Sequence, residues 1–323
     1  MTAAAEAKRL VVTDQAFGGV RHERAAAEAA GAAFAEHQCR GEAETLAAVA
    51  GAHAVLNNFA PMTRPVLAAL APGAVVVRYG VGVDNVDLAA ARELGVRVCN
   101  VPDYGVEEVA DHAAAFTLAL CRRLGRFDAG IRAGGWKIGA MAQGLRSLRT
   151  TTVGLIGMGR IARAYAGRMS AFGCRIVGHD PYVSEEAARA AGVEPLARDA
   201  VIAAANILSL HVPATAETRH MIDAAAIRRM PEGAILINCS RGGLVDEAAL
   251  AAALASGHLS GAGLDVFETE PLAEDSPLRA APDVLMSPHA AFYSDASVDA
   301  LQRLAAEEAL RGLRGEPLRC ALT

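Results

Sequence analysis

Three side chains suited to acid–base and carboxylate chemistry stand just after three apolar runs of the chain. Arg241, Glu270 and His289 each follow a run of the kind that forms a buried strand. The carboxyl ends of parallel strands meet at one edge of a sheet, where ligands bind, so we expect the three side chains to converge there. Singly, each also fits a structural role: a surface charge, a helix-terminal acid or a turn histidine.

Taken together, the three residue types match the needs of hydride exchange at C2 of a 2-hydroxy or 2-keto acid. Arg241 can bind the substrate carboxylate and C2 oxygen through paired hydrogen bonds. His289 can exchange the hydroxyl proton near neutral pH. Glu270 can orient His289 and stabilise its imidazolium form. The joint placement therefore predicts an oxidoreductase site rather than three unrelated residues.

A glycine-rich loop, 157–162, joins an apolar run at 153–156 to a segment with helical spacing. Gly157 allows a tight turn, and Gly159 lets a pyrophosphate approach the helix N-terminus, where N–H groups and the helix dipole favour an anion. A second predicted strand ends at Asp180, whose carboxylate would bind ribose hydroxyls and repel a 2′-phosphate. These features predict a dinucleotide site that prefers NAD to NADP; the alternative is a structural turn.

Strand-like and helix-like segments alternate along the chain, which is typical of parallel sheets covered by helices. We predict an α/β protein with two doubly wound parallel-sheet domains. A Rossmann NAD domain at 102–289 is inserted into a flavodoxin-like substrate domain formed by 1–101 and 290–323. In the first domain, helices are expected at 24–35, 42–50, 61–70 and 87–94, and strands at 10–12, 54–56, 74–79 and 96–99. The amphipathic helix at 294–314 is expected to return to that domain.

The segment 106–124 has apolar residues on most faces and contains Asp111 and His112. A helix of this kind is usually buried between domains or subunits. The following segment, 125–149, is rich in glycine and is expected to be irregular. It holds the single tryptophan, Trp136, which we expect to pack, at an oligomer contact; a role in substrate binding is the alternative.

The bulk composition limits the class of protein. The chain has 323 residues, 53% of them hydrophobic and 21% charged, which is an ordinary globular composition with room for two domains. A net charge of −5 predicts no nucleic-acid partner. The apolar runs are too short for a membrane span and the N-terminus has no apolar signal core, so a cytoplasmic protein is expected. Six scattered cysteines without Cys-x-x-Cys spacing predict buried thiols and no metal site.

Four stretches are similar to the signatures of D-isomer-specific 2-hydroxyacid dehydrogenases. They are Gly157 to Ala162, Asn238 to Glu247, Gly263 to Pro271 and Ser287 to His289. The likeness runs from about Tyr79 to the C-terminus. Further stretches at 76–87, 99–102 and 289–294 most resemble the branch that includes C-terminal-binding protein. The resemblance implies an NAD-dependent oxidoreductase acting on CH–OH groups, and a homodimer joined through about 102–150.

The resemblance also implies roles for individual residues. Arg241, Glu270 and His289 would be catalytic. Arg78, the backbone of Val81 and Gly82, and Phe292 would contact the substrate; Phe292 stands where that branch often carries Trp. The cofactor would contact Gly157, Met158, Gly159, Arg160, Ile161, Asp180, His211, Pro213, Thr218, Cys239, Ser240, Arg241, Asp265 and His289. Of these, Asp265 would face the nicotinamide amide, Arg160 the pyrophosphate, and Pro213 and Thr218 the adenosine side.

Two other functions share most of these motifs. One is a non-enzymatic binding protein that senses NADH, as the corepressor members of the resembling branch do. The other is a formate- or phosphite-type dehydrogenase of the same fold, which would differ only in its substrate pocket. The dehydrogenase of a small anionic 2-hydroxy acid is the main hypothesis.

Overall fold

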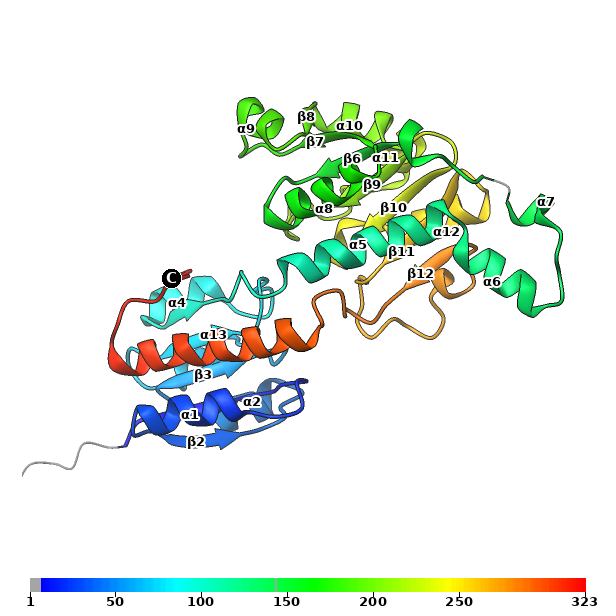
Figure 1. The fold of residues 1–323 in the computed structure, drawn as a ribbon. Coiled ribbons are helices and arrows are strands. Elements are labelled where there is room, and N and C mark those ends of the chain that lie inside the picture. Colours follow the sequence, from blue (N-terminus) through cyan, green and yellow to red (C-terminus); the bar gives the residue numbers. More distant parts are fainter. Residues whose placement is uncertain (1–6, 143) are drawn as a thin grey trace, which may run out of the picture. The chain divides into compact units, whose positions relative to one another are not determined.

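The computed structural model describes residues 7–142 and 144–323, which form two compact units (Figure 1). One unit combines the chain up to Gly105 with Tyr293–Thr323, and the other is Val106–Phe292. Each unit contains a single parallel sheet flanked by helices. The prediction of two doubly wound α/β domains, one inserted into the other, is confirmed. The proposed boundaries at 101/102 and 289/290 lie a few residues before those of the units.

The first unit has five strands in the order β2-β1-β3-β4-β5, the flavodoxin-like order. Its elements are β1 (Arg9–Val12), α1 (Arg21–Ala29), β2 (Ala33–Glu36), α2 (Glu42–Val49), β3 (Ala54–Asn57), α3 (Arg64–Ala68), β4 (Val75–Arg78), α4 (Leu88–Leu94), β5 (Arg97–Cys99) and α13 (Asp295–Arg314). Helices α1 and α13 share one apolar core with the sheet, and α2, α3 and α4 share the other. The inner strands β1, β3 and β4 are buried along most of their length, as in other parallel sheets, whereas the edge strand β2 is exposed or partly exposed.

One element of this unit differs from the prediction. The helix expected over 24–35 ends at Ala29, and the residues after it form β2. Gly31 adopts a φ of 61°, which ends the helix, and Ala33–Glu36 then pair in parallel with β1. Alanine-rich sequence favours a helix locally, but pairing with β1 decides the outcome.

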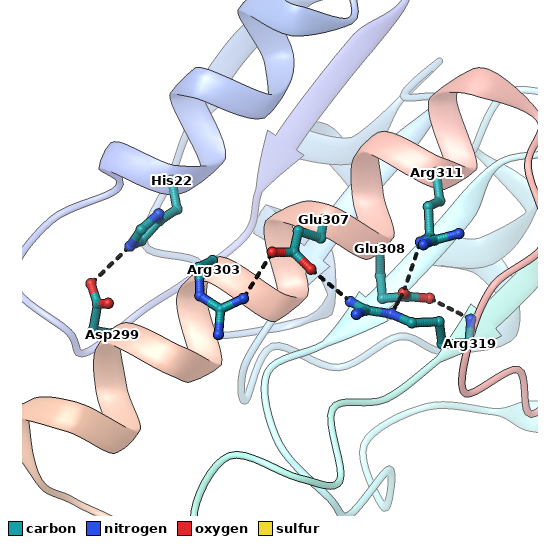
Figure 2. Close-up of polar contacts among 7 residues, drawn as sticks. All are labelled: His22, Asp299, Arg303, Glu307, Glu308, Arg311 and Arg319. Atoms are coloured by element: carbon teal, nitrogen blue, oxygen red, sulfur yellow. Dashed lines mark hydrogen bonds and ion pairs between the residues drawn. The ribbon is translucent and has the colours of Figure 1, made fainter.

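Polar contacts attach α13 and the C-terminal tail to the first unit (Figure 2). Asp299 on α13 lies 2.8 Å from Nε2 of His22 on α1. In the tail, Arg319 binds Glu308 at 2.6 Å and Glu307 at 3.0 Å, both on α13. Because Glu308 is almost fully buried, its guanidinium partner compensates the buried charge. Helix α13 thus belongs to the first unit.

The second unit has seven strands in the order β12-β11-β10-β9-β6-β7-β8. Its elements are α5 (Val106–Cys121), α6 (Leu124–Arg132), α7 (Ile138–Met141), β6 (Thr152–Ile156), α8 (Arg160–Ala171), β7 (Arg175–His179), α9 (Glu185–Ala190), β8 (Glu194–Pro195), α10 (Arg198–Ala204), β9 (Ile207–Leu210), α11 (Ala224–Arg229), β10 (Ala234–Asn238), α12 (Glu247–Ala255), β11 (Leu259–Leu264) and β12 (Val284–Met286). Helices α5, α8 and α9 cover one face, and α10, α11 and α12 the other. The strand order reverses between β6 and β9, which is where a Rossmann fold binds its ligand.

The segment after α5 is more regular than predicted. Helix α5 ends at Cys121 because Arg123 takes a φ of 53° and its guanidinium donates to the Ser260 carbonyl at 2.6 Å. Helices α6 and α7 then occupy part of the segment that was expected to be irregular. Trp136 between them is 86% exposed, so it does not pack within this chain, and its packing at an oligomer contact stays a prediction.

Four of the six cysteines are buried and two are partly exposed, and all six are free thiols. Among the described residues, no helix has the length and apolar character needed to cross a membrane.

Candidate active site

The glycine loop lies at the switch point of the second sheet, between β6 and α8. Gly157 has a φ of 90°, and a Cβ there would lie 2.4 Å from the His211 carbonyl oxygen. Gly159 is the N-cap residue of α8 and offers no side-chain cap, and a Cβ built on it meets no atom within 4 Å. Open space beside uncapped N–H groups suits a pyrophosphate. Ala162 is fully buried, so the small residue in place of a third glycine permits close packing of the helix.

Asp180 follows β7 and turns back to the glycine loop. Its Oδ2 accepts a hydrogen bond from the Met158 N–H at 2.8 Å, and its Oδ1 accepts one from the Tyr182 N–H at 2.9 Å. Both bonds fix the carboxylate beside the loop, where the predicted ribose contact requires it. Arg160 is exposed at the start of α8, and Ile161 is partly buried next to it.

The loop after β10 carries Arg241. The Asn238 side chain holds this loop, since its Nδ2 donates to the Arg241 carbonyl at 2.8 Å and its Oδ1 accepts from the Ser240 N–H at 3.0 Å. The next residue, Gly242, lies against the backbone of the loop after β11, where a Cβ would lie 1.8 Å from the Phe267 carbonyl carbon. Only glycine permits this contact, which brings the loops of Arg241 and Glu270 together.

Glu270 and His289 form a direct pair. Nδ1 of His289 lies 2.7 Å from Oε2 of Glu270, whose other oxygen accepts from the Phe267 N–H at 3.1 Å. Burial by itself raises the pKa of Glu270, but the His289 hydrogen bond and charge, the Phe267 N–H and the charge of Arg241 together bring it below its ordinary value. Glu270 is thus a carboxylate at neutral pH. The three catalytic candidates therefore interact electrostatically, since both His289 and Arg241 lower the pKa of Glu270.

Asp265 holds the backbone around His289. The Asp265 carbonyl accepts from the His289 N–H at 2.8 Å, and its carboxylate accepts from the N–H groups of Ala290 and Ala291 at 2.8 and 2.9 Å. His289 has a φ of 54°, a left-handed conformation that costs a non-glycine residue roughly 1–2 kcal/mol. The three bonds from consecutive residues stabilise that conformation and set the direction of the imidazole.

The other predicted cofactor residues lie at the same sheet edge. His211 follows β9, and burial lowers its pKa to about 4, so its ring is neutral. Thr218 donates to the Pro213 carbonyl at 2.8 Å and closes a turn. Ser240 donates to the Leu210 carbonyl at 2.7 Å, which ties the β10 loop to the end of β9. Burial, with the charge of Asp265, raises the pKa of the Cys239 thiol and keeps it protonated.

Three of the four predicted substrate residues belong to the first unit: Arg78 is the last residue of β4, and Val81 and Gly82 follow the strand. The Arg78 guanidinium lies 5.9 Å from the centre of the Phe59 ring, and the Val81 carbonyl accepts from the Asn100 side chain at 2.7 Å. Val81 is exposed and Gly82 partly exposed. Phe292, the fourth, is the last residue of the second unit and is partly buried.

The family model for the D-isomer specific 2-hydroxyacid dehydrogenase NAD binding domain matches residues 114–291. This range contains the glycine loop, Asp180 and all three catalytic candidates. The chain belongs to the D-isomer specific 2-hydroxyacid dehydrogenase family. The second unit is accordingly an NAD-binding domain, and the recognition made from the motifs is confirmed at the level of the family. The closer likeness to the C-terminal-binding-protein branch stays a prediction.

The chain is also similar to individual proteins. D-3-phosphoglycerate dehydrogenase of Mycobacterium leprae (strain TN) is 41% identical over 272 residues, which are 84% of this chain and 51% of that protein. Glyoxylate reductase of Korarchaeum cryptofilum (strain OPF8) is 40% identical over 245 residues, 75% of this chain and 74% of that protein. D-lactate dehydrogenase of Aquifex aeolicus, solved with NAD and lactic acid, is 27% identical with a TM-score of 0.85, over 95% of this chain and 96% of that one. The chain spans about half the length of the phosphoglycerate dehydrogenases it matches.

Two residues that shape the site were not singled out as site residues from the sequence. Asn238 is the last residue of β10 and organises the Arg241 loop. Ser287 follows β12 and donates to Oδ1 of Asp265 at 2.5 Å. Both lie inside motifs that carry the family resemblance, and their position at a strand end was the available signal.

Proposed function

We propose that the protein is an NAD-dependent D-2-hydroxyacid dehydrogenase, or 2-keto acid reductase. The observation that supports this most directly is the 2.7 Å contact between His289 and Glu270, in the unit that carries the glycine loop. Hydride transfer is the chemistry that bound NAD(H) supplies. The protein contributes a proton donor and acceptor at His289, a carboxylate that stabilises its charged form, and a cation at Arg241.

In the reduction of a 2-keto acid, Arg241 binds the substrate carboxylate and the C2 oxygen. His289, charged and held by Glu270, donates a proton to that oxygen as C2 is reduced. In the reverse direction, neutral His289 accepts the hydroxyl proton. A general acid–base residue of this kind typically contributes about 100- to 10,000-fold to the rate. Arg78, Val81, Gly82 and Phe292 are proposed to contact the rest of the substrate.

NAD(H) is proposed as the preferred cofactor over NADP(H). The open space at Gly159 and the uncapped start of α8 fit a pyrophosphate. The Asp180 carboxylate, fixed by two backbone N–H groups, would bind ribose hydroxyls and would repel a 2′-phosphate. His211, Pro213, Thr218, Cys239, Ser240 and Asp265 are proposed as further cofactor contacts.

A homodimer is proposed to form through the segment at about 102–150. Large apolar side chains on and around α6 and α7 are exposed, among them Leu124 at 56%, Ile138 at 68% and Trp136 at 86%. A cluster of this kind on one segment is typical of a surface that another chain covers. Sedimentation analysis supports the proposal if the protein is dimeric and Trp136→Ala weakens the dimer. A wild-type monomer at micromolar concentration would contradict it.

The function is tested by following NADH absorbance with glyoxylate, hydroxypyruvate, pyruvate and phosphohydroxypyruvate. The relatives named above make glyoxylate and the phosphorylated acid the first choices. His289→Ala is expected to abolish turnover while NADH binding persists. His220 provides a matched control, because its Nε2 also lies 2.8 Å from a carboxylate, that of Glu268. His220→Ala is expected to retain turnover. Retained turnover in His289→Ala would refute the assignment.

A further inference from the structure

Helix α5 carries a histidine, His112, to which the proposed function gives no role. Its Nε2 lies 2.9 Å from Oγ of Ser287, and Ser287 in turn lies 2.5 Å from Oδ1 of Asp265. Asp265 is 1% exposed and holds the three residues 289–291 through their N–H groups. A continuous chain of hydrogen bonds therefore runs from α5 to the backbone of the proposed acid/base residue.

The packing of α5 on β11 brings His112 to this position. A Cβ on Gly261 would lie 3.1 Å from Leu120, and one on Gly263 would lie 2.7 Å from Phe116, so the helix lies directly on the strand. Four helix residues rise about 6.0 Å and two strand residues about 6.6–6.8 Å. The steps from Leu120 to Phe116 to His112 on the helix are therefore about as long as the steps from Gly261 to Gly263 to Asp265 on the strand. This match brings His112 beside Asp265. The His112 ring also packs edge-on against Phe116, with centroids 4.5 Å apart.

The direction of the hydrogen bonds follows from counting protons. Oδ1 and Oδ2 of Asp265 accept the Ala290 and Ala291 N–H groups, so the carboxylate acts as an acceptor toward its neighbours. Ser287 has one hydroxyl hydrogen, which it donates to Asp265. Oγ of Ser287 can then only accept from His112, so Nε2 of His112 carries a hydrogen. These two hydrogen bonds hold the Ser287 hydroxyl in a single orientation, which a solvent-exposed hydroxyl would not keep.

We infer that His112 is a positioning residue for the proposed acid/base histidine, acting through Ser287 and Asp265. In this role it acts through these residues rather than by contacting substrate or cofactor. It holds the Ser287 hydroxyl toward the Asp265 carboxylate. Asp265 in turn stabilises the left-handed backbone conformation of His289 and so sets the direction of the His289 imidazole. The kinetic part of this inference rests on the proposed function, whereas the hydrogen-bond chain does not.

Two variants of His112 separate positioning from mere packing. His112→Gln keeps an N–H donor at the end of the side chain, and His112→Leu fills similar space without one. His112→Leu is expected to lower kcat between about 10- and 100-fold, the scale of a small misplacement of a catalytic group, with the Kd for NADH within about twofold of wild type. His112→Gln is expected to recover most of the loss. Ser287→Ala is expected to match His112→Leu, and the double variant to add little because both break one chain.

The neighbouring Asp111→Asn is the matched control. Asp111 is on the same helix, is 69% exposed and pairs with Arg168, so kcat is expected to stay at the wild-type value. Equal kcat for wild type, His112→Leu and Ser287→Ala would overturn the inference, as would a loss in His112→Leu that His112→Gln does not recover.

A nuclear magnetic resonance measurement tests the chain without turnover. In wild type, the His112 ring nitrogens are expected to show hydrogen on Nε2, and His112→Leu is expected to shift the amide signals of Ala290 and Ala291. Unshifted amides would overturn the positioning role. If these signals behave as expected but wild type reduces no 2-keto acid, the proposed function fails while the hydrogen-bond chain stands.

Discussion

Nδ1 of His289 and Oε2 of Glu270 lie 2.7 Å apart, although 19 positions separate the two residues in the chain. Glu270 is placed by the loop after β11 and His289 by the end of β12, so the pairing of these strands creates the contact. The same carboxylate accepts from the Phe267 N–H. Strand pairing therefore brings the two side chains together, and the Phe267 N–H helps to hold the Glu270 carboxylate in place.

The first prediction concerns Glu270→Gln. The amide keeps the shape of the side chain but removes the charge that stabilises imidazolium, so kcat for keto-acid reduction is expected to fall on the order of 100-fold. The activity profile is expected to move to lower pH, because His289 must then be protonated without its carboxylate partner. The pKa of Glu270 lies below its ordinary 4.5, so the wild-type Glu270 carboxylate keeps its charge over the whole measured pH range. Steady-state rates from pH 5 to 9 test this, and an unmoved profile would contradict it.

Substitutions of the two loop glycines are predicted to impair different properties of the protein. Gly159→Val places its side chain in open space where the pyrophosphate would lie, so folding is expected to persist while the Kd for NADH rises at least about tenfold. Gly157→Ala meets the His211 carbonyl at a φ of 90° and is expected to destabilise the unit by about 1–3 kcal/mol. Thermal unfolding and NADH titration distinguish the two. The prediction fails if Gly159→Val binds NADH as wild type does.

Asp180 is predicted to select against NADP(H). Asp180→Asn keeps an oxygen that can accept the Met158 N–H but removes the charge, so the ratio of kcat/KM with NADH to that with NADPH is expected to fall about tenfold, or 1.4 kcal/mol. Asp199→Asn, a change at a surface carboxylate on α10, is the control and is expected to leave the ratio unchanged. An unchanged ratio in Asp180→Asn would show that another group distinguishes NADH from NADPH.

Glu23 is predicted to make the stability of the first unit depend on pH. It is fully buried, and its Oε1 accepts from Tyr79 at 2.7 Å and Gln302 at 3.2 Å. Burial raises its pKa above the ordinary 4.5, and the hydrogen bonds offset this only in part. The folded state thus binds the proton more tightly than the unfolded chain, and stability falls as pH rises from 4.5 through the folded pKa.

Glu23→Gln removes this titration, so its melting temperature relative to wild type is expected to be higher at pH 8 than at pH 4.5. The difference is expected to change by about 2–4 °C if roughly 1 kcal/mol is involved. Thermal unfolding of both proteins in matched buffers measures it. A constant difference between the two pH values would contradict the prediction.

Much of the fold and site followed from short-range features of the sequence. Gly157 must adopt a conformation that other residues avoid, and Asp180 must end the next strand, so the loop could be recognised without coordinates. Likewise, Arg241 and His289 follow apolar runs, and parallel strands align their carboxyl ends. These expectations needed only the local pattern and the rule that such ends share one edge.

Only the tertiary structure decided the remaining features. Strand β2 forms where alanine-rich sequence favours a helix, because pairing with β1 outweighs local preference. The contact between His112 and Ser287 joins residues 175 positions apart, and it depends on how closely α5 packs on the glycines of β11. No local pattern encodes that distance. The sequence by itself determined the glycine loop and the types of the candidate catalytic residues, whereas packing between distant segments decided how these residues are held.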